Sequence, residues 1–182
     1  MTRVAGFTLT CTQKNSIDYI CAAHHRQSVM PATLHRKDIF FVSIQLILFA
    51  LYLFHFQAFD FRAPEWLQYA GAFLAVSGIL IILWAILLLN NSLSPFPTPR
   101  AQGELIRSGI YRKVRHPIYT GILMTALGYA VFSGNGIRLL LFCALWWLFM
   151  QKARYEEQLL EQKFSAYAEY KTQSGMFLPR LG

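Results

Sequence analysis

The sequence predicts an all-α integral membrane protein, a helical bundle with about four spanning helices and a cytoplasmic C-terminal amphipathic helix. The first observation is composition: the 182 residues are 55% hydrophobic and only 14% charged, whereas soluble domains average roughly 25% charged residues. The second is that residues 39–59 and 67–89 contain no Asp, Glu, Lys or Arg. Each run reaches the ~20 residues that a helix needs to cross a ~30 Å hydrocarbon layer.

The third observation is the distribution of positive charge. Of the 17 Lys and Arg residues, only Arg62 and Arg138 lie in the two short connections that we expect on the outer side. The other 15 lie in the N-terminal tail, in residues 90–116 and after residue 150. Because cytoplasmic loops carry an excess of Lys and Arg, we expect a multi-pass protein with both termini and the central loop in the cytoplasm.

The net charge of +8 does not indicate nucleic-acid binding here. The sequence has no zinc-finger spacing, no basic-region heptads and no aromatic motif of an RNA-binding sheet. The three cysteines, Cys11, Cys21 and Cys143, lack C-x-x-C spacing, so neither a disulfide framework nor a metal site is predicted. We therefore expect a membrane partner, no nucleic acid and no metal.

Two regions are expected: a mixed polar N-terminal tail, residues 1–38, and a membrane domain, residues 39–182. No apolar core of a signal peptide follows Arg3. Met30 comes shortly before the first span, so we hypothesise that it is an alternative translation start. N-terminal sequencing of natively expressed protein that returned residues upstream of Met30 would exclude that start.

The first expected span, residues 39–59, contains Gln45 and His55. An ionisable residue at membrane depth is a functional candidate, but His55 lies within one turn of the outer end, where interfacial placement explains it equally well. The second span, residues 67–89, contains small residues that permit close packing between helices. These are Gly71, Ser77 and Gly78.

Residues 90–100 interrupt the helical pattern, because prolines at 95, 97 and 99 favour extended backbone. Two apolar stretches follow, residues 117–132 and 137–150, joined by a Ser-Gly-Asn-Gly turn. Both are short against the usual ~20 residues, so either the helices extend into flanking polar residues or the hairpin is tilted. Beyond them, apolar spacing of three to four residues predicts that the fourth span continues as an amphipathic helix and stops near Gly175.

Polar residues concentrate in residues 103–121 and 152–157. An antiparallel hairpin over residues 117–150 would bring both stretches to the cytoplasmic face as one pocket. Its cations, carboxylates, aromatic hydroxyls and glycines would complement a zwitterionic cofactor with an aromatic base. The members are Tyr111, Arg112, Lys113, Arg115, His116, Tyr119, Glu156, Glu157, Gly103, Gly109 and Gly121. On charge and spacing alone, a basic topology determinant beside a solvated acidic face explains them as well.

Two blocks of sequence favour the cofactor pocket over the topology determinant. The first runs from Gly103 to Gly121 with the core G-x-Y-R-x-x-R-H-P-x-Y-x-G. The second begins at Glu156-Glu157 and continues with Leu160, Phe164, Tyr167, Tyr170 and Pro179. In this order and separation the blocks resemble the isoprenylcysteine carboxyl methyltransferase family, and phospholipid N-methyltransferases share much of the pattern. The resemblance extends from Pro95 to Pro179, about half of the chain, and includes the hydropathy of the first two spans.

The resemblance implies a membrane methyltransferase that binds S-adenosyl-L-methionine at the cytoplasmic face. The positions that match the family's cofactor contacts are Gly103, Glu104, Leu105, Ile106, Tyr111, His116, Pro117, Ile118, Tyr119 and Glu156. A basic residue four positions before the glutamate contacts the acceptor in eukaryotic prenylcysteine enzymes, and Lys152 occupies that position here. Because lysine does not grip a carboxylate as arginine does, this departure weakens a prenylcysteine assignment, for which Arg154 could compensate.

The implied function is methyl transfer to a lipophilic acceptor, such as a carboxylate of the prenylcysteine type. The acceptor would reach the site from the bilayer. An ionised carboxylate needs no general base at neutral pH, so no residue is nominated for proton transfer. Arg115 is nominated to orient the reacting groups. The alternatives are a phospholipid or other lipid N-methyltransferase on the same scaffold, and a non-catalytic membrane protein that keeps the fold.

Overall fold

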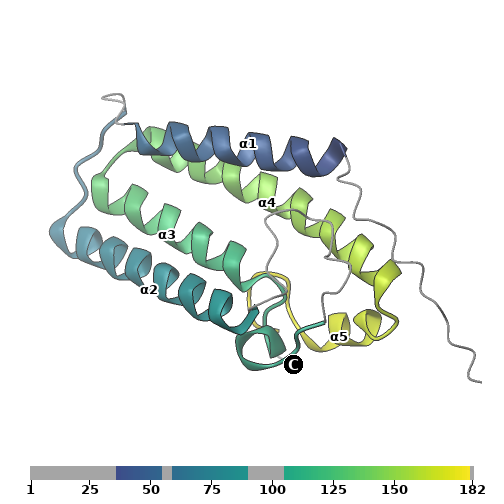
Figure 1. The fold of residues 1–182 in the computed structure, drawn as a ribbon. Coiled ribbons are helices and arrows are strands. Elements are labelled where there is room, and N and C mark those ends of the chain that lie inside the picture. The colour runs from purple at the N-terminus through teal and green to yellow at the C-terminus, as the bar shows by residue number, and fades with distance from the viewer. Residues whose placement is uncertain (1–35, 55–58, 90–104, 181–182) are drawn as a thin grey trace, which may run out of the picture.

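The computed structural model describes residues 36–54, 59–89 and 105–180, in which all regular structure is helical. The elements are α1 (Arg36–Leu53), α2 (Glu65–Leu89), the short 3-10 helix η2 (Gly109–Arg112), α3 (Pro117–Ser133), α4 (Gly136–Lys163) and α5 (Tyr167–Gln173). Figure 1 shows α1 to α4 as the long helices, with α5 at one end. The all-α prediction is confirmed for these ranges, while His55 and the predicted loop at residues 90–100 lie outside them.

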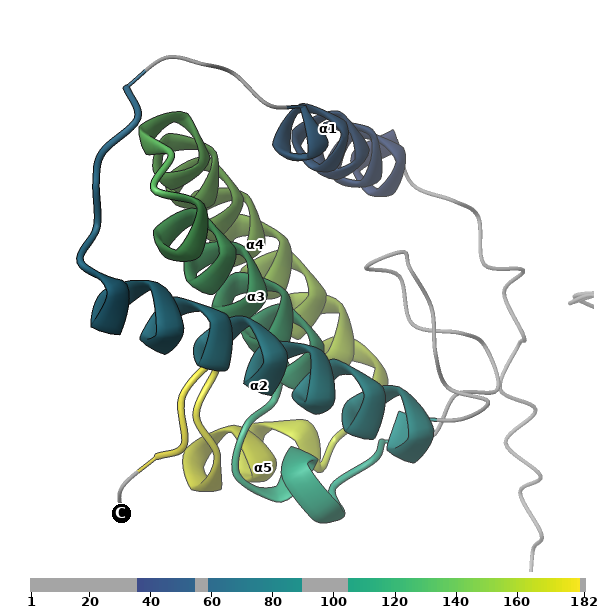
Figure 2. The same cartoon turned by 90° about the vertical axis from the view of Figure 1, so that its left-hand side faces the viewer.

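The long helices do not pack in their order along the chain. Helix α2 lies against α3, α3 against α4, and α4 against α1. Figure 2 shows α2 crossing in front of α3 and α4, while α1 lies apart from α2. Before α2, residues 59–61 lie against the α3–α4 turn, where the Phe61 N–H donates to Gly134 O at 2.7 Å and the Gly136 N–H to Phe59 O at 2.9 Å.

Helices α2 and α3 approach closely because glycines face glycines. A Cβ atom on Gly78 would lie 2.6 Å from the carbonyl oxygen of Gly121, and one on Gly128 would lie 2.5 Å from that of Gly71. Small residues at a helix interface allow such an approach, which confirms the predicted packing role of Gly71 and Gly78. Ser77 instead donates its hydroxyl to a carbonyl oxygen of its own helix at 2.8 Å.

The apolar core lies between α3 and α4 and includes a residue beyond α5. Its members are Leu123, Ala126, Leu145, Phe149, Ala153 and Phe177. Helix α1 closes one side, since Leu48, Phe49 and Tyr52 pack against this cluster, and Phe49 meets Phe149 edge to face at 6.5 Å. The core therefore joins three long helices to the C-terminal segment.

The helix in the first predicted span ends earlier than expected. Helix α1 ends at Leu53 rather than near Phe59, and Phe59 has a positive φ of 60°, which belongs to a turn. Asn135 Nδ2 then donates to the carboxylate of Asp60 at 2.6 Å, which ties this connection to the α3–α4 turn. Arg138, expected in that turn, lies inside α4, where it is buried with its guanidinium 4.6 Å from the ring centroid of Tyr129.

Two of the described helices are long and apolar enough to cross a membrane, α2 with 25 residues and α4 with 28. Helix α3 is apolar but has 17 residues, and α1 begins with three charged residues. Large apolar side chains of α2 are exposed on the isolated chain: Trp66, Tyr69, Phe73, Leu80, Leu83, Trp84 and Leu87. Because a helix that is apolar on all sides must be covered, the protein has membrane character, and length with composition supports two of the four expected spans.

The C-terminal part departs from the single helix predicted to continue to near Gly175. Helix α4 extends well beyond Met150, but it ends at Lys163, and Phe164 is extended with φ −121° and ψ 110°. Helix α5 then turns across the end of the bundle (Figure 1) and buries Tyr167 and Tyr170. The periodicity did not reveal this break, because the same apolar spacing suits one long helix or two short ones.

Candidate functional site

Segments distant in the sequence meet at one end of the bundle, here called the site end. They are the part of α1 up to Gln45, residues 111–119, residues 152–157 of α4, α5, and the C-terminal loop Ser174–Leu178. Residues before α3 and on α4 lie in contact although 42 positions separate Arg115 from Glu157. The α3–α4 hairpin thus brings together the two polar stretches that the sequence analysis expected in one pocket.

His116, Tyr119 and Phe149 form a stack of rings. The ring centroids of His116 and Tyr119 are 5.3 Å apart with 3° between the planes, and those of Tyr119 and Phe149 are 4.8 Å apart with 7°. Pro117 occupies the first helical position of α3, where its fixed φ favours helix initiation and places Tyr119 in the first turn. Since offset-stacked rings attract one another, the imidazole has a defined orientation.

Glu156 is the accessible carboxylate of the site. Its side chain is 25% exposed, and its Oε2 lies 3.7 Å from His116 Nδ1. The Tyr119 hydroxyl donates to the same oxygen at 2.9 Å. An ionised carboxylate accepts up to four hydrogen bonds, so Glu156 keeps the capacity to bind a cationic ligand.

Glu157, the adjacent residue, is buried and paired on both oxygens. Arg115 Nε donates to its Oε1 at 2.7 Å, and His116 Nε2 lies 3.4 Å from that oxygen. Lys171 Nζ lies 3.3 Å from its Oε2. A buried charge requires such pairing, so Glu157 holds the surrounding segments together.

Arg115 connects α4 to the C-terminal segments. Besides Glu157, its guanidinium Nη1 donates to the carbonyl oxygen of Lys171 at 3.1 Å and to that of Ser174. These carbonyls lie at the C-terminal end of α5, where helical acceptors lack partners and a cation is favoured. Arg115, nominated from the sequence to orient reacting groups, is therefore placed to act through Glu157 and α5.

Lys152 lies one turn before Glu156 on the same face of α4, as its spacing predicts. Its Nζ donates to Gln45 Oε1 at 2.8 Å and lies 5.4 Å from the ring centroid of Tyr119. The residue is only 2% exposed, so its ammonium is held by protein groups. Gln45, which the sequence marks only as a polar residue in a span, is therefore part of the site.

Two of the predicted residues lie apart from this cluster. Arg154 is exposed, since two positions along a helix rotate it roughly 200° from Lys152. Tyr111 is buried in η2, and its hydroxyl donates to Ala85 O of α2 at 3.4 Å.

Burial raises the pKa of Tyr111 well above its ordinary value. Burial also raises the pKa of Tyr170, whose hydroxyl donates to Tyr111 O, to about 12, so both phenols are protonated at neutral pH.

Of the remaining predicted cofactor contacts, four lie in the described residues. Pro117 is buried and Ile118 half-buried in the first turn of α3, and Leu105 and Ile106 are half-buried in the segment before η2. Two lie outside the described residues: Gly103 and Glu104. Among the glycines expected to admit a ligand, Gly109 and Gly121 have a packing role, since added Cβ atoms would meet α2 at 2.6 Å.

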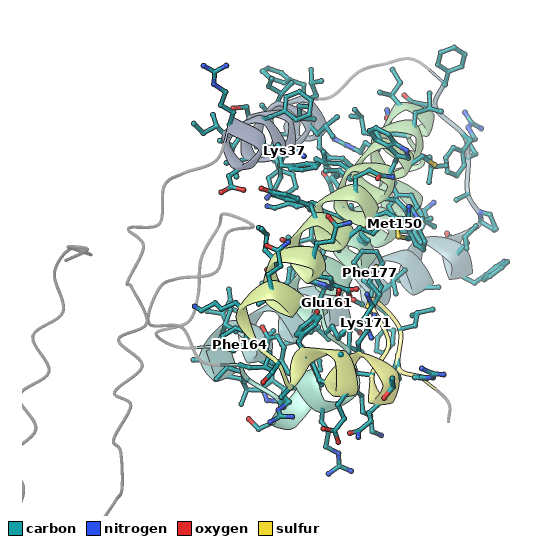
Figure 3. The ribbon with its side chains drawn as sticks, turned by 90° about the vertical axis from the view of Figure 1, so that its right-hand side faces the viewer. Lys37, Met150, Glu161, Phe164, Lys171 and Phe177 are labelled. Carbon is teal, nitrogen blue, oxygen red and sulfur yellow. The ribbon has the colours of Figure 1, made fainter. Side chains whose placement is uncertain are left out.

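Some residues of the site belong to no motif that the sequence analysis identified. Phe177 meets the His116 ring edge to face, with centroids 6.2 Å apart. Lys171 pairs with Glu161 at 2.9 Å as well as with Glu157, and Figure 3 shows the Glu161 and Lys171 side chains close together. The Lys171 contacts cross the α4–α5 turn, and the Phe177 contact depends on the return of the chain after α5. Only knowledge of these two turns could have indicated them.

The model of the phospholipid methyltransferase family matches residues 66–167 of the chain. This match covers more than half of the 182 residues. It includes nearly all of α2, together with η2, α3 and α4. The matched region therefore contributes His116, Tyr119, Lys152 and Glu156 to the site, whereas α1 and the C-terminal loop lie beyond it.

The chain is also similar to individual proteins. It is 38% identical over 77 residues to protein-S-isoprenylcysteine O-methyltransferase of Saccharomyces cerevisiae, covering 41% of this chain and 32% of the yeast protein. It is 28% identical over 155 residues to the nickel-cobalt-cadmium resistance protein NccN of Alcaligenes xylosoxydans xylosoxydans, covering 82% and 67%. The chain thus spans about a third of the yeast protein. Within the described ranges, no group of three or more His, Cys, Asp or Glu side chains could hold a metal ion.

A solved structure has a similar fold, that of the eukaryotic intramembrane Ras methyltransferase ICMT (isoprenylcysteine carboxyl methyltransferase) without a monobody. The TM-score is 0.60 at 23% sequence identity. The similarity covers 80% of this chain and 53% of that chain. At this identity the likeness concerns the arrangement of the helices.

Proposed function

The chain belongs to the phospholipid methyltransferase family, and we propose that it transfers a methyl group from S-adenosyl-L-methionine to a lipophilic acceptor at the cytoplasmic membrane face. The observation that carries this proposal is the accessible carboxylate of Glu156 beside the stacked rings of His116 and Tyr119. Because the yeast relative is matched over only 32% of its length, the proposal rests on the site rather than on that protein's name.

The residues at the site end fit this cofactor by their chemistry. S-adenosyl-L-methionine carries an ammonium, a sulfonium and an aromatic base, for which carboxylates and aromatic faces are the complementary groups. Glu156 offers a carboxylate that is 25% exposed. His116 and Tyr119 offer stacked rings beside it. We therefore propose Glu156 as the group that holds the cationic part of the cofactor.

The catalytic contribution of the chain is positioning. When bound, S-adenosyl-L-methionine supplies a methyl group that its sulfonium already activates, so well-placed reactants account for most of the rate. The Tyr119 hydroxyl fixes Glu156 through a 2.9 Å hydrogen bond. Arg115 fixes Glu157 at 2.7 Å, and Glu157 in turn lies 3.4 Å from His116. No residue is assigned to proton transfer, because an ionised carboxylate acceptor needs none.

For the acceptor, we propose a carboxylate of the prenylcysteine type. The ammonium of Lys152 is almost fully buried beside the site. At low dielectric a buried cation attracts a carboxylate and repels a protonated amine. The alternative, a lipid N-methyltransferase, would have to place an amine near this ammonium. The acceptor's apolar chain would lie in the bilayer, next to the apolar surfaces of the long helices.

We further propose that the protein is multi-pass, with both termini and the site end on the cytoplasmic side. Basic residues gather at the site end in the described ranges: Arg36, Lys37, Arg107, Arg112, Lys113, Lys163, Lys171 and Arg180. The opposite end of the bundle has Arg62 and Arg138. This asymmetry agrees with the positive-inside rule if the site end faces the cytoplasm.

Calorimetric titration of detergent-purified protein with S-adenosyl-L-methionine tests the proposal. Wild-type protein is expected to bind. Both Glu156→Gln and His116→Ala are expected to weaken binding by roughly tenfold or more, because a hydrogen bond to a charged group contributes about 1.5–3 kcal/mol. Glu169→Gln is the matched control, since it neutralises an exposed carboxylate on α5.

The possible outcomes separate the candidate functions. Absence of binding to well-folded wild-type protein would refute the methyltransferase proposal and favour a non-catalytic membrane protein with this fold. Binding that neither substitution weakens would keep the cofactor but place it elsewhere. Binding that the two site variants weaken and Glu169→Gln leaves unchanged would support the proposed site.

A further inference from the structure

The C-terminal loop Ser174–Leu178 contributes to the site although the family match ends at residue 167. After α5 the chain turns back and pairs its backbone with the residues before α3. The Arg115 N–H donates to Gly175 O at 2.8 Å, and the His116 N–H donates to Met176 O at 3.1 Å. The loop is therefore fixed to the backbone of His116 itself.

The side chain of Phe177 enters the core from this loop. It is 7% exposed and belongs to the apolar cluster between α3 and α4, and Figure 3 shows it next to Met150 of α4. Its ring meets His116 at 6.2 Å and 64°, and Trp146 at 6.3 Å and 66°. Its carbonyl oxygen accepts a 2.7 Å hydrogen bond from Thr120 Oγ1.

The contacts of the His116 ring show what Phe177 adds. Tyr119 stacks on the ring, and Glu156 and Glu157 lie 3.7 and 3.4 Å from its two nitrogens. Phe177 meets the ring edge to face from the C-terminal loop. Stacking alone permits two rings to slide and tilt against each other, whereas an additional edge-to-face contact restricts that motion.

We propose that Phe177 is a positioning residue of the site, which holds the His116 ring against Tyr119 and thereby keeps Glu156 oriented for a cationic ligand. This inference rests on the proposed function. Three contacts connect Phe177 to Glu156: Phe177 with His116, His116 with Tyr119, and the Tyr119 hydroxyl with Glu156 at 2.9 Å. Through Phe177, the C-terminal loop accordingly helps to position the side chains of the site.

Two substitutions at one position test this role, with S-adenosyl-L-methionine as the titrated ligand and the His116 ring signals in NMR as a second readout. Phe177→Leu is expected to weaken binding roughly tenfold at most, since an aromatic pair contributes about 0.5–1.5 kcal/mol, and to shift the His116 signals. Phe177→Tyr keeps the ring and is expected to retain both properties. Leu178→Ala is the control, because Leu178 is adjacent to Phe177 in the chain but is 72% exposed.

Each outcome bears on the inference. Unchanged binding and unchanged His116 signals in Phe177→Leu would overturn it, as would an equal loss in Phe177→Tyr and Phe177→Leu. If wild-type protein does not bind the ligand, the proposed function fails, while the His116 signals still test the packing claim. If Phe177→Leu does not fold, Thr120→Val replaces it. This substitution removes the hydroxyl that donates to Phe177 O at 2.7 Å and also to His116 O at 3.2 Å. Binding and signals like those of the wild type would then overturn the inference.

Discussion

At the residue scale, the adjacent carboxylates Glu156 and Glu157 have different roles. Successive helical residues point about 100° apart, so only one of the two can face the interior of the site end. Glu157 faces Arg115 and Lys171 and is 3% exposed, whereas Glu156 is 25% exposed. A sequence block shows two identical residues here, and the structure distinguishes a carboxylate that binds segments together from one that remains open to a ligand.

Under the proposed function, we expect Lys152 to set the acceptor preference of the site. We expect Lys152→Met to raise KM for a prenylcysteine-type carboxylate acceptor by roughly tenfold or more, because a charge-assisted contact contributes about 1.5–3 kcal/mol. The physical reason is that the buried ammonium, held by Gln45 at 2.8 Å, is the cation beside the Tyr119 ring. Transfer of a labelled methyl group to acceptors of both classes measures this effect.

The control for this substitution is Lys163→Met, which removes an exposed ammonium from the end of the same helix. The Kd for S-adenosyl-L-methionine should change little in either variant, so that an acceptor effect is separated from a cofactor effect. An unchanged KM for the carboxylate in Lys152→Met, or faster methylation of an aminophospholipid than in the wild type, would argue for the N-methyltransferase alternative.

At the element scale, the sequence predicted both ends of α3, because a local signal marks each of them. Pro117 opens α3, and Gly134 closes it with a left-handed φ of 60°; both residue types are favoured at these positions. The break after Lys163 has neither signal, because Phe164 simply becomes extended. Its cause is tertiary: the turn allows α5 to bury Tyr167 and Tyr170.

The α2–α3 contact yields a second prediction. We expect Gly128→Ala to lower the thermal stability of the detergent-purified protein, because the new methyl group would lie 2.5 Å from backbone atoms of Gly71 and Ala75. These are backbone atoms that no rotamer change can move, and overpacking costs about 1–3 kcal/mol. The melting temperature of the variant measures the effect.

The matched control is Ile79→Val, which changes one methyl group on an outer position of α2 that is 46% exposed. It should leave the melting temperature close to that of the wild type. If Gly128→Ala were as stable as Ile79→Val, the close approach of α2 and α3 would be contradicted.

At the scale of the whole molecule, composition and patterning predicted the helical class, the membrane character and the meeting of two polar stretches. They did not predict that α1 packs on α4, which brings Gln45 to Lys152. Nor did they predict that the chain returns after α5 and places Phe177 against His116. The family resemblance pointed to His116, Tyr119, Lys152 and Glu156, whereas the contributions of Gln45, Lys171 and Phe177 depend on the order in which the helices pack, which no local pattern encodes.

The orientation in the membrane is the last prediction. In a chain whose own cysteines are replaced, Arg62→Cys is expected to react with a membrane-impermeant maleimide on intact cells, and Arg180→Cys only after permeabilisation. Arg62 follows Phe61, which is bonded to the α3–α4 turn, and Arg180 bonds to Thr172 of α5 at the site end. Both side chains are exposed, so access alone does not separate them. Labelling of Arg180→Cys on intact cells would contradict the proposed orientation, because it would place the site on the side of the membrane away from the proposed cytoplasmic cofactor.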